Sequence, residues 1–287
     1  MVGGAATNSP GPQAIFADVA LGIGTDSNPK PCPNGNYWDG VLESWKPTVE
    51  HRLWRAHSDE VNNQLLRRWL PAGQGRLLKT DLFDEAVGGG LFPELAARAD
   101  EVVGVDVSPA AVRAALARYP RLDAHVASVL SVPFANGSFD AGVSNSTLDH
   151  FKSHATLRSA VSELARVIRP GGKLVITLDN RANPIVALRT SILFRPLHRL
   201  GVVPYFVGAT YGARGLAKLL DDTGFDVVEI TSFMHCPPQL AAYWAGRRRA
   251  PHDNGRHLRR VLRFEAMERW PTRHLTGHFV GALAVRR

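Results

Sequence analysis

The order of apolar and polar residues along the chain changes its period several times, and each change predicts an element. From about residue 52 to residue 70 the apolar positions recur at helical spacing, and Pro71 ends the pattern. Short apolar runs of strand length then alternate with helical segments. The expected strands lie near 76–84, 101–107, 125–129, 139–144 and 173–178, and the helices between them near 91–98, 109–119 and 156–168. Strands that alternate with helices predict a parallel sheet covered on both faces.

The alternation stops after residue 179 and resumes later in the chain. A helix is expected near 214–222, then a sixth strand at 225–233 and a seventh near 277–285. The chain is therefore expected to form an α/β fold with a doubly wound, mostly parallel seven-stranded sheet and helical insertions.

The first 36 residues differ from the rest of the chain. They are rich in Gly, Pro, Ala and Asn and have no sustained period, which predicts a disordered or loosely packed tail. Residues 37–287 are expected to form one domain. Its additions to the sheet are a helical extension at 37–75 and insertions at 180–210 and 234–276.

Composition adds a bias toward anionic partners. The 287 residues carry a net charge of +8, and many arginines crowd residues 247–263. A solvated helix face explains that stretch equally well. Nucleic acid is disfavoured because no interleaved aromatics accompany the arginines. Cys32 and Cys236 form no disulfide framework, and neither a spanning segment nor a signal peptide is recognisable, so a cytoplasmic protein is expected.

A glycine cluster follows the first expected strand, where backbone can pass close to a ligand. The dinucleotide fingerprint fails because its sixth position, counted from Gly88, is Pro93. The pattern that fits is acid-x-Gly/Ala-x-Gly-x-Gly, read as Asp84, Ala86, Gly88 and Gly90.

This loop resembles motif I of the class I S-adenosylmethionine-dependent methyltransferases, of the methyltransferase type 11 kind. Residues 132–140 resemble the family's Leu-Pro-Phe…Ser-Phe-Asp run, and residues 165–174 resemble its Leu-Lys-Pro-Gly-Gly turn. The resemblance covers residues 76–180. It implies a Rossmann-like methyltransferase fold, S-adenosylmethionine as cofactor, and Asp106 as the acid that binds the ribose hydroxyls. A carboxylate suits that role because it accepts two hydrogen bonds from a vicinal diol.

The resemblance also implies cofactor contacts at Val107, Ser128, Val129 and Asn145. Ser128 stands where the family often has an acid that binds the adenine amine. A hydroxyl accepts that bond more weakly than a carboxylate, so modest cofactor affinity is expected.

Lys79 and Asp81 are unexpected in a central strand, which is normally apolar. They can pair with neighbours on one face or reach the ligand. Alternatively, the strand ends near Asp81 and the loop is long, in which case Asp81 and not Asp84 is the acid of the motif.

Methyl transfer is an in-line displacement that needs an aligned nucleophile, sometimes with a base. Asp149 and His150 follow the fourth strand, where the family often places substrate-facing residues, and histidine is a base near neutral pH. They are the candidate catalytic residues, although capping the next helix is the simpler role. No metal spacing is present among the histidines, so no metal is expected.

Polar residues after the fifth strand are the candidates for substrate binding. Asp179, Asn180 and Arg181 lie at the expected mouth of the pocket, and Tyr211 is expected to line it. Arg181 suits an anionic group, while an Asx-rich turn is the structural alternative.

The expected function is methylation of a small molecule, at oxygen, on an amphiphilic or anionic biosynthetic intermediate. The insertion at 180–210 supports this because it combines apolar and basic residues. The same composition also suits peripheral contact with an anionic membrane. The alternative function is binding of the cofactor without methyl transfer, to assist a cyclisation or to act as a sensor or scaffold.

Overall fold

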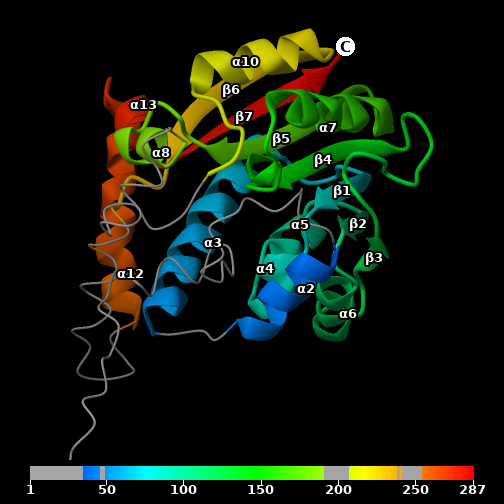
Figure 1. The fold of residues 1–287 in the computed structure, drawn as a ribbon, viewed down its shortest axis with the longest axis horizontal. Helices are drawn as coiled ribbons and strands as arrows, with labels where there is room; N and C mark the ends of the chain where they lie inside the picture. The colour runs from blue at the N-terminus through cyan, green and yellow to red at the C-terminus, as the bar shows by residue number, and fades with distance from the viewer. Residues whose placement is uncertain (1–34, 46–48, 191–206, 238–239, 241–253) are drawn as a thin grey trace, which may run out of the picture.

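The computed structural model describes residues 35–45, 49–190, 207–237, 240 and 254–287. Its centre is a seven-stranded sheet in the order β3-β2-β1-β4-β5-β7-β6, in which only β7 runs antiparallel (Figure 1). The strands are β1 (Arg76–Thr80), β2 (Glu101–Asp106), β3 (Asp123–Val126), β4 (Phe139–Asn145), β5 (Ile168–Asp179), β6 (Phe225–Phe233) and β7 (Phe279–Arg286). The expected doubly wound, mostly parallel sheet is confirmed.

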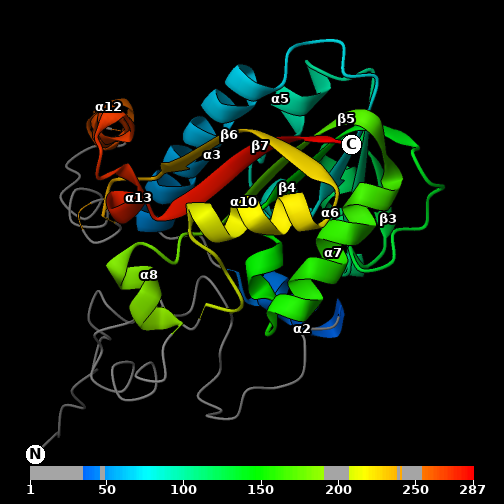
Figure 2. The same cartoon turned by 90° about the horizontal axis from the view of Figure 1, so that it is seen from above.

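Helices cover both faces of this sheet (Figure 2). One face packs against α7 (His154–Val167) and α10 (Ala213–Asp222). The other packs against α3 (Val49–Trp69), α5 (Phe92–Ala96) and α6 (Pro109–Arg118). The remaining elements are α2 (Gly35–Ser44), α4 (Phe83–Val87), η1 (Leu148–His150), α8 (Pro184–Arg189), α12 (Asn254–Leu262), η3 (Arg263–Arg269) and α13 (Arg273–Thr276).

Local sequence signals explain where several helices begin. The Ser108 hydroxyl accepts a hydrogen bond from the Ala111 N–H at 3.0 Å, and Pro109 occupies the first turn of α6. Ser153 caps α7 in the same way through the Thr156 N–H. These caps direct both helices away from the edge at which the strands end.

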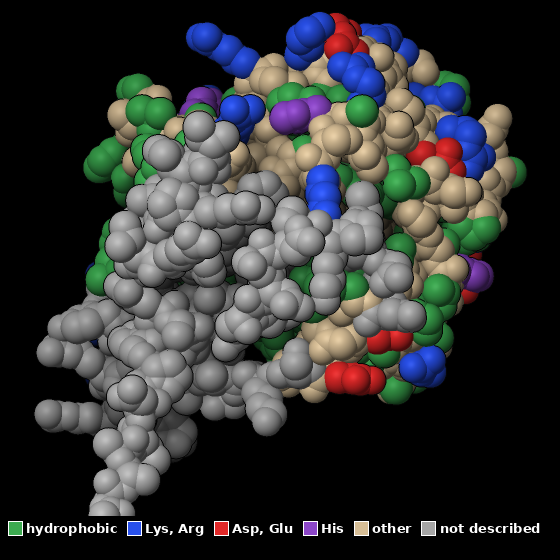
Figure 3. All heavy atoms as spheres, in the orientation of Figure 1, with side chains coloured by type: hydrophobic (Ala, Val, Ile, Leu, Met, Phe, Trp, Pro, Cys, Tyr) green, Lys and Arg blue, Asp and Glu red, His purple; other side chains and the backbone are tan. Residues whose placement is uncertain are grey.

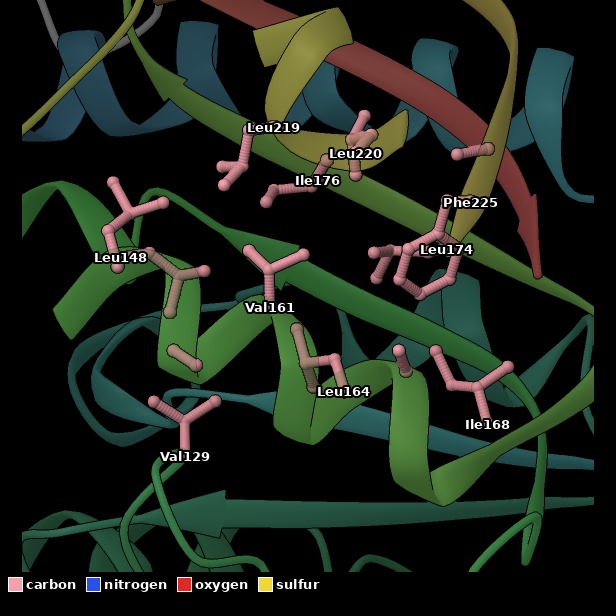
Figure 4. Packing of buried hydrophobic residues seen from close by; sticks show 14 of the residues in the cluster. Val129, Leu148, Val161, Leu164, Ile168, Leu174, Ile176, Leu219, Leu220 and Phe225 are labelled. Atoms are coloured by element: carbon pink, nitrogen blue, oxygen red, sulfur yellow. The ribbon is translucent and has the colours of Figure 1, made fainter. Parts of the chain in front are cut away.

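The core between the sheet and α7 is built from aliphatic side chains (Figure 4). Val161 and Leu164 of α7 lie over Ile176 and Leu174 of β5, and Leu219 of α10 packs at the same layer. Burial of so many branched side chains on both faces fixes the sheet and therefore the strand ends that form the site.

Three strand boundaries differ from those expected. β1 ends at Thr80 and not near residue 84, because the chain turns at Asp81, whose φ is +70°. β3 begins and ends earlier, at Asp123–Val126. β5 begins at Ile168, so the expected turn at 169–172 lies within it, where its pairing with β4 shifts register.

The insertions are described in part. Residues 191–206 of the first insertion and 238–239 and 241–253 of the second lie outside the described residues, as does the expected tail up to residue 34. Gly35 and Asn36 belong to α2 and not to that tail. Across the described ranges, no helix has both the length and the apolar character needed to cross a membrane.

Basic side chains do not form a single patch on the face shown in Figure 3. Lys and Arg lie along its upper and right-hand edges, with Asp and Glu among them. Of the arginine-rich stretch, Arg256, Arg259 and Arg260 are exposed on α12, and Arg263 is exposed at the start of η3.

Candidate functional site

The carboxyl ends of the parallel strands form one edge of the sheet, the usual position of ligand sites in open α/β folds. β2, β4 and β5 end there at Asp106, Asn145 and Asp179, and β1 ends one residue before Asp81. The edge therefore brings together residues that are far apart in the sequence, including most of those predicted to bind cofactor or substrate.

Asp106 is held firmly at the end of β2. One carboxylate oxygen accepts from the Leu82 N–H at 2.7 Å and the other from the Ser108 N–H at 2.8 Å. Burial is the main cause that raises the pKa of Asp106, and these two hydrogen bonds oppose it. Each oxygen keeps a further lone pair, so the carboxylate can still accept from a diol.

Asp81 lies beside Asp106 and fits the acid position better than Asp84. It follows β1 directly, and its carboxylate accepts from the Phe83 N–H at 2.8 Å. Burial, and then repulsion from Asp106, raises the pKa of Asp81 well above its ordinary value. Two buried carboxyl groups thus lie close together on neighbouring strand ends.

The glycine motif is not placed as predicted. Asp84 and Ala86 lie inside α4, and Gly88 ends that helix, so the glycine turn does not follow the strand. Asp84 pairs with Arg55 of α3 at 2.8 Å. The reason for the error is the early turn at Asp81, which places a helix before the glycines.

With Asp81 as the acid, the three glycine positions of the motif fall on Phe83, Glu85 and Val87. Glu85 is fully buried and forms an ion pair with Lys79 of β1 at 2.8 Å. Gly90, with φ of +60°, packs against the Glu85 carboxylate. The Lys79–Glu85 ion pair therefore fills space that glycines at these positions would leave open.

The charges at this edge are unbalanced in favour of anions. Burial, and then repulsion from Asp84, raises the pKa of Asp59 on α3 to about 7. Within the described residues around β1 and α4, five carboxyl groups interact with one another and with two cations. They are Asp59, Asp81, Asp84, Glu85 and Asp106 on one side, and Arg55 and Lys79 on the other.

Helix α2 covers this end of the edge. Its Asp39 accepts from the Ala110 N–H at 3.0 Å and from the Ser108 hydroxyl, at the start of α6. Gly35 packs against the carbonyl of Val107, one of the predicted cofactor contacts, leaving no room for a side chain. Trp45, just after α2, packs edge-on against Phe83. Aromatic cover of this kind excludes water from the strand ends.

The residues predicted to hold the adenine lie beyond β3. Ser128 is partly buried, and its hydroxyl accepts from the Leu130 N–H at 3.2 Å. Val129 is buried in the core between the sheet and α7 and not in the pocket. Ser128 therefore remains a candidate ligand contact, whereas the Val129 side chain is structural.

Asn145 ends β4 and accepts from the Thr177 hydroxyl at 2.9 Å. It borders a small cavity of about 10 Å³ between α3 and the sheet. Its neighbours there include Asn62 and Leu91. Asn145 lies between the cofactor end of the edge and the far end, and its contact with the cofactor stays a prediction.

The two predicted catalytic residues point in different directions. Asp149 is 2% exposed, and one of its oxygens accepts from the Ser146 hydroxyl at 2.9 Å and the Asp179 N–H at 2.8 Å. Its other oxygen has no hydrogen-bond partner among the described residues. The His150 ring is half-buried and packs edge-on against Trp38 of α2, with 5.1 Å between ring centres. The two do not form a dyad.

The predicted substrate residues after β5 separate into different roles. Burial, and then repulsion from Asp149, raises the pKa of Asp179 to about 8. Asn180 is fully buried, and its amide donates to the carbonyls of His274 and Gly277 at 2.8 and 2.9 Å. Its assignment to substrate was wrong, because the backbone of the last insertion occupies its side chain.

Arg181 and Tyr211 lie side by side after β5, where the Arg181 N–H donates to the Tyr211 carbonyl at 3.2 Å. Arg181 is exposed, and Tyr211 is half-buried with its ring 4.6 Å from that of His154. Across the described ranges, no cluster of three or more His, Cys, Asp or Glu is placed to hold a metal ion.

Sequence analysis missed the residues that organise the site over long sequence distances. Glu85 gave no signal, while Lys79 was noted only as an unexpected charge. Glu265 of η3 accepts from the Met234 and His235 N–H groups and contacts His57, so it joins α3 to the end of β6. Only tertiary structure shows these contacts.

Comparison with known proteins agrees with this geometry. A family model described as "Methyltransferase domain" matches residues 83–176. A probable S-adenosylmethionine-dependent methyltransferase of Mycolicibacterium smegmatis is 30% identical over 192 residues, 65% of each chain. An O-methyltransferase of Aspergillus sclerotiorum is 31% identical over 141 residues, 46% of this chain and 48% of the relative. The matched part thus spans less than two thirds of either relative.

A solved structure shows the same fold. The geranyl diphosphate C-methyltransferase from Streptomyces coelicolor superposes with a TM-score of 0.53 at 16% identity, covering 79% of this chain and 77% of that one. Three observations indicate the same fold: the strand order with antiparallel β7, the acid at the end of β2, and the matches to known proteins. Residues 83–176 thus match the methyltransferase domain family, and the fold of the chain is that of the class I S-adenosylmethionine-dependent methyltransferases.

Proposed function

We propose that this protein transfers a methyl group from S-adenosylmethionine to an oxygen atom of a small amphiphilic or anionic molecule. The observation that carries the proposal is the pair of carboxyl groups, Asp81 and Asp106, on adjacent strand ends. The excess of carboxylates around them suits a ligand with a diol and a positive charge. When bound, the cofactor supplies a methyl group on a sulfonium centre.

Different residues along the edge bind the cofactor and the acceptor. Asp106 and Asp81 accept the ribose hydroxyls, and Ser128 accepts from the adenine amine. Asn145, at the end of β4, marks the boundary between cofactor and acceptor. Because α2 covers this region with Asp39 and Trp38, it excludes water from the reacting centre.

On the acceptor side, His150 takes the proton of the hydroxyl that is methylated. Its ring reaches the pocket mouth beneath Trp38, while Asp149 is fixed under the loop by Ser146 and by the β5 backbone. Asp149 therefore positions the loop that carries His150. Arg181, exposed at the mouth, is free to attract an anionic acceptor.

The relatives support oxygen as the atom methylated, since the fungal protein is named an O-methyltransferase. The choice of acceptor falls to the insertions at 180–210 and 234–276, which carry no motif. They meet at the acceptor end, where Asn180 and Asn183 bond to backbone near α13.

The test is release of S-adenosylhomocysteine by the purified protein with a panel of phenols and carboxylic acids. Turnover should require an acceptor, and His150→Gln should lower kcat about 10²-fold or more. His125→Gln, whose ring contacts Asp123 and Phe134 on the cofactor side of the sheet and not the acceptor side, should not change it. Conversion of an acceptor without release of S-adenosylhomocysteine, or an unchanged kcat for His150→Gln, would contradict the proposal.

A further inference from the structure

A fully buried ion pair lies beneath the cofactor end of the edge. Lys79 of β1 and Glu85 of α4 are 2.8 Å apart, and their side chains are 3% and 0% exposed. Burial of two charges is costly, and a pair of apolar residues often stabilises a fold as well or better. Stability alone therefore gives no reason for a charged pair at this position.

The contacts of Lys79 point to the loop that follows β1. Its ammonium group donates to the carbonyl of Asp81 as well as to Glu85. Asp81 has φ of +70°, a left-handed conformation that is unfavourable for a residue with a side chain. The Asp81 N–H also donates to the Val105 carbonyl at 2.8 Å. Lys79 thus holds one side of a constrained turn.

The contacts of Glu85 extend this link to the glycine turn. One oxygen accepts from the Leu91 and Phe92 N–H groups at 2.8 and 3.1 Å. A Cβ on Gly90 would lie 2.6 Å from the same oxygen, so the turn fits closely around the carboxylate. The ion pair joins the end of β1 to the chain ten residues later.

The charge of Lys79 also acts on both acids of the site. Burial alone would lower its pKa, but Glu85, Asp81 and Asp84 together raise it, so it remains a cation. Its charge lowers the pKa of Asp81 and of Asp106, against the effect of burial. The groups that face these acids come from β1, α4 and the start of α6. They are Lys79 of β1, Asp84 and Glu85 of α4, the Leu82 and Phe83 N–H groups at the start of α4, and the Ser108 N–H before α6.

We propose that Lys79 is a positioning residue of the cofactor site, holding the Asp81 turn through its carbonyl and keeping a positive charge beneath the carboxylates of Asp81 and Asp106 that accept the ribose hydroxyls. This inference rests on the proposed function. It gives a reason for the charged strand: the acids need a nearby cation to stay ionised in a covered pocket.

The experiment measures S-adenosylhomocysteine binding by calorimetry from pH 5.5 to 8.5, with thermal melting of each variant. In Lys79→Met/Glu85→Gln the pair is neutral, and the glutamine oxygen still accepts from Leu91 and Phe92. Affinity should fall at least tenfold at pH 7. The pH at which affinity is half lost should move up, because loss of the Lys79 charge affects both acids and outweighs loss of the opposing Glu85 charge near Asp106.

A second variant moves the same midpoint in the opposite direction. Glu85→Gln alone removes a negative charge that raises the pKa of Asp106, so half-loss of affinity should move to lower pH. A purely structural pair would change affinity without opposite shifts of the midpoint. Glu85→Gln keeps the oxygen that accepts from Leu91 and Phe92 but leaves the Lys79 charge without its partner carboxylate, so its melting temperature is compared with that of the double variant.

The matched control is Arg67→Met/Glu94→Gln. It removes a surface ion pair of 2.7 Å between α3 and α5, away from the strand ends, and should leave both affinity and midpoint unchanged. Equal midpoints in all variants would overturn the role of Lys79 while leaving the proposed function intact. Absence of binding to the unmodified protein would overturn both.

Discussion

The two ends of the same sheet edge hold buried carboxyl groups in different surroundings. At the ends of β1 and β2, Asp106 accepts from two backbone N–H groups and faces the ammonium of Lys79. At the ends of β4 and β5, Asp149 accepts from a hydroxyl and one N–H group, and its charge repels Asp179.

The difference follows from what each end has to bind. A cofactor with a diol and a positive charge is the same in every turnover, so acids held in fixed geometry suit it. The acceptor end is formed by amides and hydroxyls that join strands to the insertions, such as Asn180 and Asn183. These neutral groups hold the strands and the insertions together, while other segments determine which acceptor binds.

The largest expected effect comes from the cofactor end. Asp106→Asn removes one carboxylate oxygen and the charge, so affinity for S-adenosylhomocysteine should fall about 100-fold, or about 2–3 kcal/mol. Calorimetry at pH 7.5 measures it.

The control for that variant is Asp100→Asn, on the surface at the opposite edge of the sheet. It should bind as the unmodified protein does. A change of less than twofold for Asp106→Asn would show that the acid at the end of β2 does not hold the ligand.

At the acceptor end, Asp179 should make stability depend on pH. Its folded pKa of about 8 lies above the ordinary 3.8, because of burial and Asp149, with Arg189 opposing. The folded state therefore binds more protons between about pH 4 and 8, and stability falls as pH rises through that window. In Asp179→Asn the free energy of unfolding should not fall across this window. Between pH 5 and 7 it should therefore rise by about 2 kcal/mol relative to that of the unmodified protein.

Urea unfolding at several pH values measures this difference. Asp226→Asn, exposed near the start of β6, serves as control and should follow the unmodified protein. Parallel stability curves for Asp179→Asn would mean that the carboxyl group is ionised in the fold, and the contrast between the two ends would be lost.

The smallest effect concerns the amide scaffold. Asn183 caps α8 by accepting from the Ile185 N–H at 2.9 Å, and its amide donates to the Thr276 carbonyl. Asn183→Ala should cost about 1–2 kcal/mol of unfolding free energy without changing cofactor affinity. Thr190→Ala, at the other end of α8, should cost less than about 0.5 kcal/mol. A loss of affinity in Asn183→Ala would show that the two ends are coupled.

The sequence predicted what depends on local patterns. Alternating periods gave the sheet and its helices, and Ser108-Pro109 gave the start of α6. The Asp106 position followed from the family resemblance. Each of these features depends on residues that are close together in the sequence.

The first strand shows where local patterns fail. Because of Gly88 and Gly90, the motif was assigned with Asp84 as its acid. The chain instead turns at Asp81, because Lys79 and Glu85 pair inside the fold. Whether a charge is buried and paired depends on residues from several elements. The acceptor end was less predictable still, since Asn180 and Glu265 act on backbone more than 30 residues away.

Calorimetric titration of the purified protein with S-adenosylhomocysteine tests the central claim most directly. The account predicts binding at one site per chain, about 100-fold weaker in Asp106→Asn and unchanged in Asp100→Asn. No detectable heat at millimolar ligand, or equal binding by both variants, would contradict a cofactor site at the ends of β1 and β2.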